Sequence, residues 1–198
     1  MVNLEIIARY KADNLFLRAK TNSGEEVVIK PATLEDINRL YGFHEDLKYY
    51  RRKAESHRKT ERSMMFILES KKGPFGRVTL KNIRDEGNAE YDGVTRVVDS
   101  HTKGGMTVAL KEINRFGFEE VGIEKFFLTV DSFNYKARKL YYNCGFISIS
   151  ADIPMELTEI KEKGQCWVSN LNLGGKAKRY LTEMELTKER FEFLKSLS

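Results

Sequence analysis

The hydrophobic pattern of the chain changes its period near residue 105. Before that point, apolar segments at 63–69, 75–83 and 89–98 are separated by turn residues at 71–74 and 85–88, which predicts three consecutive antiparallel strands. After it, apolar residues recur at helical spacing, and a strand at 126–130, a helix at 134–143 and a strand at 146–150 follow. This order predicts a mixed α/β chain with a mostly antiparallel central sheet, a parallel pair of strands and helices on the sheet faces.

The segment before residue 63 predicts an N-terminal hairpin and two helices. Strands are expected at 4–10 and 15–19 around a turn at 12–14, and a third short strand at 27–30 follows the turn at 21–24. Thr33 precedes two acidic residues, Glu35 and Asp36, and therefore predicts a helix N-terminus. Residues 47–62 carry many cations and few large aliphatic side chains, so we expect a second helix that lies mostly in solvent.

The C-terminal part predicts one more strand and one more helix. Residues 165–173, which include Trp167, read as the last strand of the sheet. Residues 187–197 form an amphipathic pattern with Phe191, Leu194 and Leu197 on one face, which must pack on its own domain or on a second copy in a homodimer.

The chain shows no internal repeat and no linker long enough to divide it. We expect a single domain over 1–198, made of the N-terminal hairpin extension 1–26, a core at 27–173 and a C-terminal helical extension at 174–198.

Composition excludes several classes of protein. The 198 residues are 41% hydrophobic and 32% charged, which is too apolar for a disordered chain and too evenly charged for a membrane span. Glu5 and Arg9 interrupt the N-terminal apolar stretch, which predicts a cytoplasmic protein. The net charge of +5 suits an anionic ligand. Two cysteines and three scattered histidines predict neither a disulfide framework nor a metal site.

A glycine-bearing turn lies between the strand that ends near Val98 and the helix that begins near Met106. The first N–H groups of a helix have no partner within the helix, the helix dipole favours negative charge, and glycine lets a phosphate approach the backbone. Lys103 adds a cation to Gly104 and Gly105. The spacing is neither that of a Walker A loop nor that of a dinucleotide-binding turn. A plain turn and a phosphate site are both consistent with these residues alone.

A second motif follows about thirty residues later and reads Asn134-x-x-Ala137-x-x-Leu140-Tyr141-x-x-x-Gly145-Phe146. Together with the glycine turn, it resembles the GNAT superfamily of acyl-CoA-dependent N-acyltransferases, over roughly residues 27–150. The family places Arg or Gln, then glycine, then a small residue at the turn; here His101, Gly104 and Met106 occupy those positions. The resemblance implies a sheet whose central strands splay apart to admit acyl-CoA.

The resemblance also implies which residues would bind acetyl-CoA, the co-substrate. The pyrophosphate would lie on the turn, and the pantetheine arm would pair with the end of the strand 89–98. The residues concerned are Val97, Val98, Asp99, His101, Thr102, Lys103, Gly104, Gly105, Met106, Thr107, Asn134, Ala137, Arg138 and Tyr141.

For catalysis, the resemblance implies direct attack of an uncharged amine on the thioester. Tyr141 would protonate the departing thiolate, since a phenol with a pKa of about 10 is protonated at neutral pH. Glu90 is the candidate base, with Asp92 on the same strand face and water as alternatives. Cys144 falls at a variable position of the motif and is expected to be a bystander rather than a nucleophile.

The predicted activity is therefore transfer of an acetyl group from acetyl-CoA to a primary amine of a small molecule, with an amino sugar or a polyamine as first candidates. A protein N-terminus or lysine is the alternative acceptor, and an acyl-CoA-binding module without turnover is the alternative class. The resemblance implies that residues 33–62 and 151–164 shape the acceptor pocket. No recognition helix or basic aromatic platform supports nucleic acid as a partner, and no membrane partner is expected.

Overall fold

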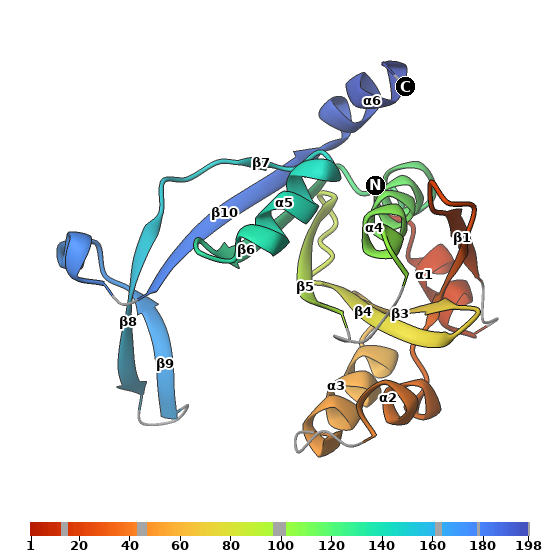
Figure 1. Cartoon of the computed structure of the whole chain (residues 1–198), viewed down its shortest axis with the longest axis horizontal. Coiled ribbons are helices and arrows are strands. Elements are labelled where there is room, and N and C mark those ends of the chain that lie inside the picture. Colours follow the sequence, from red (N-terminus) through yellow and green to blue (C-terminus); the bar gives the residue numbers. More distant parts are fainter. Residues whose placement is uncertain (13–15, 43–46, 97–101, 161–163, 178, 198) are drawn as a thin grey trace. The chain divides into compact units, whose positions relative to one another are not determined.

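The structure, a computed structural model, describes residues 1–12, 16–42, 47–96, 102–160, 164–177 and 179–197 (Figure 1). The chain divides into two compact units, Met1–Phe126 and Phe127–Ser198, and each is described by itself. The domain borders expected from the sequence stay predictions. None of the helices in the described stretches has the length and hydropathy that crossing a membrane requires.

The first unit contains four α-helices, a π-helix and a five-stranded meander among its described residues. The elements are α1 (Leu4–Ala12), β1 (Leu17–Lys20), β2 (Glu26–Pro31), α2 (Leu34–Tyr41), α3 (Leu47–Lys59), β3 (Met64–Ser70), β4 (Gly73–Lys81), β5 (Asn88–Arg96), α4 (Gly105–Phe116), the π-helix Gly117–Val121 and the start of β6 (Lys125–Asp131).

The strands β1 to β5 pair in sequence order and all of these pairs are antiparallel, as expected for residues 63–98. Leu80 lies opposite Tyr91, and Arg77 lies opposite Thr95. Between Arg77 and Thr79 the register with β5 shifts, which marks a β-bulge in this pair of strands.

Both faces of this meander are covered by helices. On one face, Tyr10 of α1 packs against Phe66 of β3 and Phe116 of α4, with ring centroids 5.2 and 5.5 Å apart. On the other face, α2 and α3 pack together and against β3 and β4 (Figure 1). A buried cluster that includes Ile37, Ala54 and Ile67 joins these helices to the sheet. β3 is therefore apolar on both faces, which explains its continuous hydrophobic run.

The expected strand at 4–10 is wrong, because this segment forms α1. Ile7 and Tyr10 are buried and lie three residues apart, on one face of the helix, and Asn3 Oδ1 accepts a hydrogen bond from the Ile6 N–H at 3.3 Å. A short apolar run fits a strand or a buried helix equally well until its neighbours are known. The N-terminal hairpin of the structure is instead β1 with β2, around the turn expected at 21–24.

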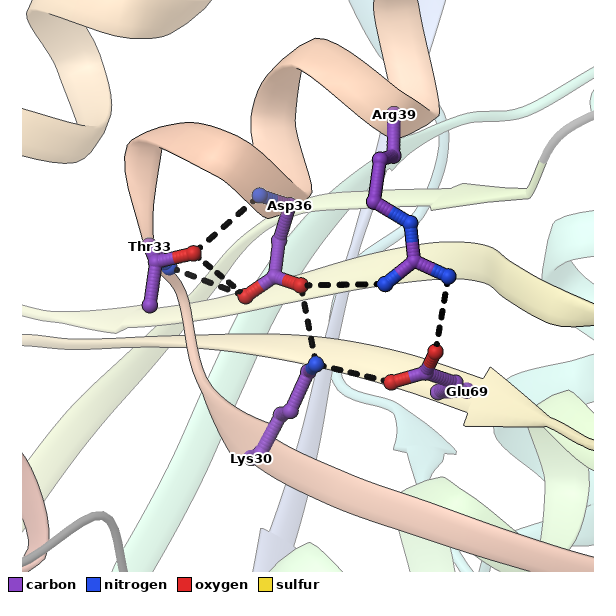
Figure 2. A network of polar contacts seen from close by, with 5 residues as sticks. All are labelled: Lys30, Thr33, Asp36, Arg39 and Glu69. Carbon is purple, nitrogen blue, oxygen red and sulfur yellow. Dashed lines mark hydrogen bonds and ion pairs between the residues drawn. The ribbon is translucent and has the colours of Figure 1, made fainter.

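The start of α2 is held by a polar network that joins it to two strands (Figure 2). The Thr33 hydroxyl accepts from the Asp36 N–H at 3.1 Å, and the Asp36 carboxylate accepts from the Thr33 N–H at 3.2 Å, which is a capping box. Lys30 of β2 lies 2.8 Å from Asp36 and 2.7 Å from Glu69 of β3, and Arg39 also contacts Glu69. The predicted N-terminus at Thr33 is confirmed, and the network fixes the helix pair to the sheet.

The second unit contains the rest of β6, α5 (Tyr135–Asn143), β7 (Ile147–Ser148), β8 (Ile153–Ile160), β9 (Gly164–Ser169), the 3₁₀ helix Leu171–Lys176, β10 (Arg179–Thr187) and α6 (Lys188–Ser196). Strand β10 lies between β6 and β8, β9 follows at the edge, and β7 also pairs with β10. The mixed α/β class with a mostly antiparallel sheet is thus confirmed.

The strand expected at 165–173 as the last of the sheet is wrong in two respects: it ends earlier, and another strand follows it. β9 ends at Ser169, a 3₁₀ helix follows, and β10 is the last strand. Thr182, Met184 and Leu186 of β10 are buried at a period of two, and Glu183 and Glu185 alternate with them. This alternation of buried and charged residues is the sequence signal that could have predicted the strand.

The expected C-terminal helix is confirmed as α6, whose N-cap Thr187 accepts from the Arg190 N–H at 3.3 Å. Arg190 Nε donates to the Gly145 carbonyl at 2.6 Å, and an added Cβ at Gly145 would lie 2.8 Å from a Leu194 methyl. Leu194 therefore packs within its own unit, while Leu197 is 69% exposed. A homodimer contact stays a prediction.

Candidate active site

The turn before α4 combines one exposed and one buried glycine. Gly104 is the N-cap with a left-handed φ of +79°, and a Cβ added to it would meet nothing within 4 Å. A Cβ on Gly105 would lie 2.6 Å from a Thr102 methyl and 3.0 Å from the Phe75 ring. The lack of a side chain at Gly105 thus lets the start of α4 pack tightly on the core, whereas the space next to Gly104 is open.

The electrostatics of this turn favour an anion at its exposed side. The turn lies at the N-terminus of the twelve-residue helix α4, where the helix dipole favours an anion, and Lys103 is exposed beside it. The Gly105 N–H is already used, because it donates to the Thr102 carbonyl at 3.2 Å. On the buried side, the Thr102 hydroxyl donates to Glu25 Oε1 at 3.3 Å, which holds the turn to the loop before β2. Open space, helix N–H groups and a cation together fit a phosphate group.

Met106 does not close this space, although it occupies a position where a small residue was expected. It is 8% exposed, and its sulfur would lie 2.9 Å from a Cβ at Gly76 of β4. The thioether therefore packs toward β4, where the glycine leaves room for it. Thr107 follows on α4 and is half-buried. The other predicted residues of this region, Val97, Val98, Asp99 and His101, lie outside the described residues.

The candidate base Glu90 lies on the face of β5 that is turned toward α3. Its carboxylate lies 3.1 Å from Lys81 Nζ and accepts from the Asn82 amide at 2.8 Å. Asp92, two residues further on the same face, lies 2.8 Å from Lys53 Nζ of α3 and 3.8 Å from Lys81. Burial acts to raise the pKa of Asp92, but the hydrogen bond from Lys53 and the neighbouring cations outweigh it and lower that pKa.

His57 lies in the same layer and was not found from the sequence. Its Nδ1 is 3.0 Å from the Ser63 hydroxyl, and burial, followed by the charge of Lys53, lowers its pKa to about 4. The imidazole is therefore neutral at neutral pH. The available signal was the spacing of Tyr50, Ala54 and His57 on one face of a helix that otherwise reads as solvated.

Arg77 of β4 is the second residue that sequence analysis missed. It is 3% exposed, and its guanidinium carbon lies 5.2 Å from the centroid of the Tyr50 ring and 5.9 Å from that of Tyr41. An arginine in an alternating strand gives no sign of burial, because the helices that cover it come from elsewhere in the chain.

Beside this layer, a surface groove is lined by residues of α3, the following loop and the end of β4, among them Ser56, His57, Ser63, Lys81 and Asn82. Two of its lining residues, Lys81 and Asn82, are the ones that contact the Glu90 carboxylate.

In the second unit, α5 carries the residues of the second motif. Asn134 is its N-cap and accepts from the Ala137 N–H at 3.1 Å, and Arg138 Nη1 donates to the Ser132 carbonyl at 3.0 Å. Tyr141 is 8% exposed, and its ring lies 5.9 Å from that of Phe146. Hydrogen bonds from Ser148 and Arg138 lower the pKa of the neighbouring Tyr142, which is 45% exposed.

The turn residues 102–107 lie at the start of α4 in the first unit, and the motif residues lie on α5 in the second unit. These two groups, and Glu90, are each described within their own unit. Cys144 is buried at the end of α5. Within the described residues, no cluster of His, Cys, Asp or Glu side chains is arranged to hold a metal ion.

Comparison with known proteins identifies the family. Residues 14–147 match the model of the acetyltransferase (GNAT) domain, and this stretch contains both the glycine turn and the α5 motif. No curated protein matches the chain.

Solved structures share the fold at low sequence identity. A spermidine N-acetyltransferase SpeG chimera from Vibrio cholerae and hSSAT aligns with a TM-score of 0.65 and 16% identity, over 83% of this chain and 97% of that chain. The Vibrio cholerae spermidine N-acetyltransferase in complex with CoA and spermine aligns with a TM-score of 0.63 and 16% identity, again over 83% and 97%. The dodecameric form of the Vibrio cholerae enzyme has a TM-score of 0.62 and 16% identity, over 83% and 95%.

The family match confirms the predicted enzyme class of N-acetyltransferase, with acetyl-CoA as donor and an amine as acceptor. The chain belongs to the GNAT acetyltransferase family.

Proposed function

We propose that the protein acetylates a primary amine of a small molecule, by direct attack of the uncharged amine on the thioester of acetyl-CoA. The turn before α4 carries the proposal, since its open space lies at the N-terminus of a long helix. The similarity of the fold to that of spermidine N-acetyltransferases supports a small amine as acceptor, and a polyamine and an amino sugar are therefore the first compounds to test.

On the donor side, acetyl-CoA supplies an activated acetyl thioester, and the chain supplies binding and orientation. We assign the pyrophosphate to the turn, where the first N–H groups of α4 and the Lys103 ammonium offer donors. The complete set assigned to acetyl-CoA is Val97, Val98, Asp99, His101, Thr102, Lys103, Gly104, Gly105, Met106, Thr107, Asn134, Ala137, Arg138 and Tyr141.

Tyr141 is assigned as the acid that protonates the departing thiolate. The Tyr141 side chain is buried on α5, and its ring packs next to Phe146, which limits its motion. Both Tyr141 and the glycine turn lie inside the stretch that matches one GNAT domain, which supports their action in one site.

Glu90 is assigned as the base that takes the proton of the amine, directly or through water. Asp92 is the weaker candidate, because Lys53 and the other cations lower its pKa and so reduce its basicity. Glu90→Gln should reduce the rate most at low pH, where less of the amine is already deprotonated.

A cytoplasmic location is part of the same proposal and is tested by cell fractionation.

The experiment is a panel of amines with release of the CoA thiol as the readout. Tyr141→Phe should lower kcat by about 100-fold or more and leave the affinity for acetyl-CoA unchanged. Tyr142→Phe is the matched control, because it removes an exposed phenol from the same helix. An unchanged kcat in Tyr141→Phe excludes its role as the acid.

The panel also separates the alternatives. Peptides with a free N-terminus or a lysine serve as the test for a protein acceptor. If calorimetry detects acetyl-CoA binding and no amine or peptide releases thiol, the protein is a binding module and the proposed activity is wrong.

A further inference from the structure

Two buried N–H groups of Arg77 have no hydrogen-bond partner within the described part of the chain. Nε and Nη1 are both inaccessible to solvent, and the whole residue is 3% exposed. The hydroxyl of Thr79, on the same face of β4 and 0% exposed, also lacks a partner there. A buried cation without hydrogen bonds is costly for a folded protein, so its presence here calls for a physical reason.

The guanidinium of Arg77 lies in a defined place. The Tyr50 and Tyr41 rings lie on its helix side at 5.2 and 5.9 Å. On its strand side is Gly93 of β5, where an added Cβ would lie only 2.8 Å from Nη2. Gly93 has a φ of +58° at the bulge of β5 against β4, so glycine both permits this turn of the strand and leaves room for the guanidinium.

The ionic groups around Arg77 carry one positive charge more than negative charges, although the charge of Arg77 also acts on Asp92. Lys53 pairs with Asp92, and Lys81 pairs with Glu90. His57 is neutral, because burial and the nearby cations lower its pKa. Among the described residues of this layer, three cations therefore face two carboxylates, and the third cation is the buried guanidinium.

We propose that Arg77 binds an anionic group, a carboxylate or a phosphate, carried by the amine that the enzyme acetylates. This inference rests on the proposed function and specifies the acceptor further. The planar guanidinium matches two oxygens of either group, and the Thr79 hydroxyl, two residues further on the same face of β4, adds a donor. Because Arg77 is shielded from water, a bound anion interacts with it more strongly than at the surface. A purely cationic polyamine would meet repulsion from the same group.

The test compares amines in matched pairs that differ in the anionic group. Ornithine is compared with putrescine for the carboxylate, and glucosamine 6-phosphate with glucosamine for the phosphate. In the wild type, the anionic member of at least one pair should have a kcat/KM about 10- to 100-fold higher, and the pair that shows this identifies the group.

Arg77→Gln should bring that ratio close to one while kcat/KM for the neutral amine changes little. Arg77→Lys should restore part of the preference, because it keeps the charge and loses the planar fork. Arg18→Gln is the control of equal charge change, since Arg18 is exposed on β1 and pairs with Glu26. Its ratio should equal that of the wild type.

Several outcomes would overturn the inference. A wild type that prefers the neutral member of both pairs excludes it without any variant. A preference that survives in folded Arg77→Gln also excludes it. If neutral amines are acetylated without any preference, only this inference fails; if no amine is acetylated, the proposed function fails. Calorimetry of ornithine and glucosamine 6-phosphate in the presence of CoA then tests Arg77 separately, with binding lost in Arg77→Gln as the expected result.

Discussion

The hydroxyl of Tyr91 donates to Asn114 Oδ1 at 2.6 Å, and both residues are buried. This bond joins β5, which carries Glu90 and Asp92 on its other face, to α4, which begins at the glycine turn. The Tyr91 ring also packs against Phe126, with centroids 5.1 Å apart. One buried tyrosine thus connects the strand proposed to carry the base with the helix proposed to bind pyrophosphate.

Tyr91→Phe should lower the free energy of unfolding by about 1–3 kcal/mol, because Asn114 loses this donor in a buried environment. Urea unfolding measures the change. In the double variant Tyr91→Phe/Asn114→Leu, the loss should be smaller than the sum of the single losses. Tyr49→Phe, at an exposed tyrosine of α3, should change stability by less than about 0.5 kcal/mol. Additive single losses would show that the bond carries no coupling.

Gly104→Glu should weaken acetyl-CoA binding by at least about 10-fold, since it places a carboxylate where the pyrophosphate is proposed. The same substitution strains the left-handed backbone, so a change of backbone alone must be excluded. Gly104→Asn provides that control, because asparagine tolerates this conformation and adds no charge. Calorimetry with acetyl-CoA gives the affinities. Equal affinities in the two variants would place the pyrophosphate elsewhere.

Stability should fall between pH 7 and pH 5 because of His57. Its pKa is about 4 in the folded protein and about 6.5 in the unfolded chain, so the unfolded chain takes up a proton first as the pH decreases. The contribution is complete above pH 6.5 and is lost toward pH 4, with about 2 kcal/mol lost by pH 5. His57→Gln should flatten this part of the curve of unfolding free energy against pH. Parallel curves for the two proteins would contradict the shift.

Thr79→Val should raise the free energy of unfolding by about 1 kcal/mol, because it removes a buried hydroxyl without a partner among the described residues and keeps the side-chain shape. Thr182→Val is the matched control. Thr182 is equally buried, but its hydroxyl lies 2.8 Å from both Ser132 Oγ and Asp152 Oδ1, so the substitution should cost about 1–3 kcal/mol. Thermal melts of both variants decide, and a destabilised Thr79→Val would reveal a partner for that hydroxyl.

Elements with strong local signals could be predicted from the sequence. The helix after Thr33 follows from its cap and acidic first turn, and the meander over β3 to β5 follows from short apolar runs bounded by turns. The glycine turn and the motif from Asn134 to Phe146 also depend only on neighbours in the chain. These patterns were enough for the family and for the donor side of the proposed site.

Other features depend on distant segments and could not be read from the chain. Residues 4–10 fold as a helix because Ile7 and Tyr10 find a buried surface formed by β3 and α4. The low pKa of His57 requires burial and the charge of Lys53 together. Neither property is encoded in a window of a few residues.

The sequence by itself determined the elements with strong local signals, the family and the residues proposed to bind acetyl-CoA, because periodicity, capping and turn chemistry act over a few residues. Only the tertiary structure decided which charges are buried. In the sequence, Arg77 is one cation among 34. In the fold, its guanidinium is buried against the rings of Tyr41 and Tyr50, and two of its N–H groups have no partner among the described residues. The physical reason is that desolvation is set by whichever segments cover a side chain, and those segments come from elsewhere in the chain.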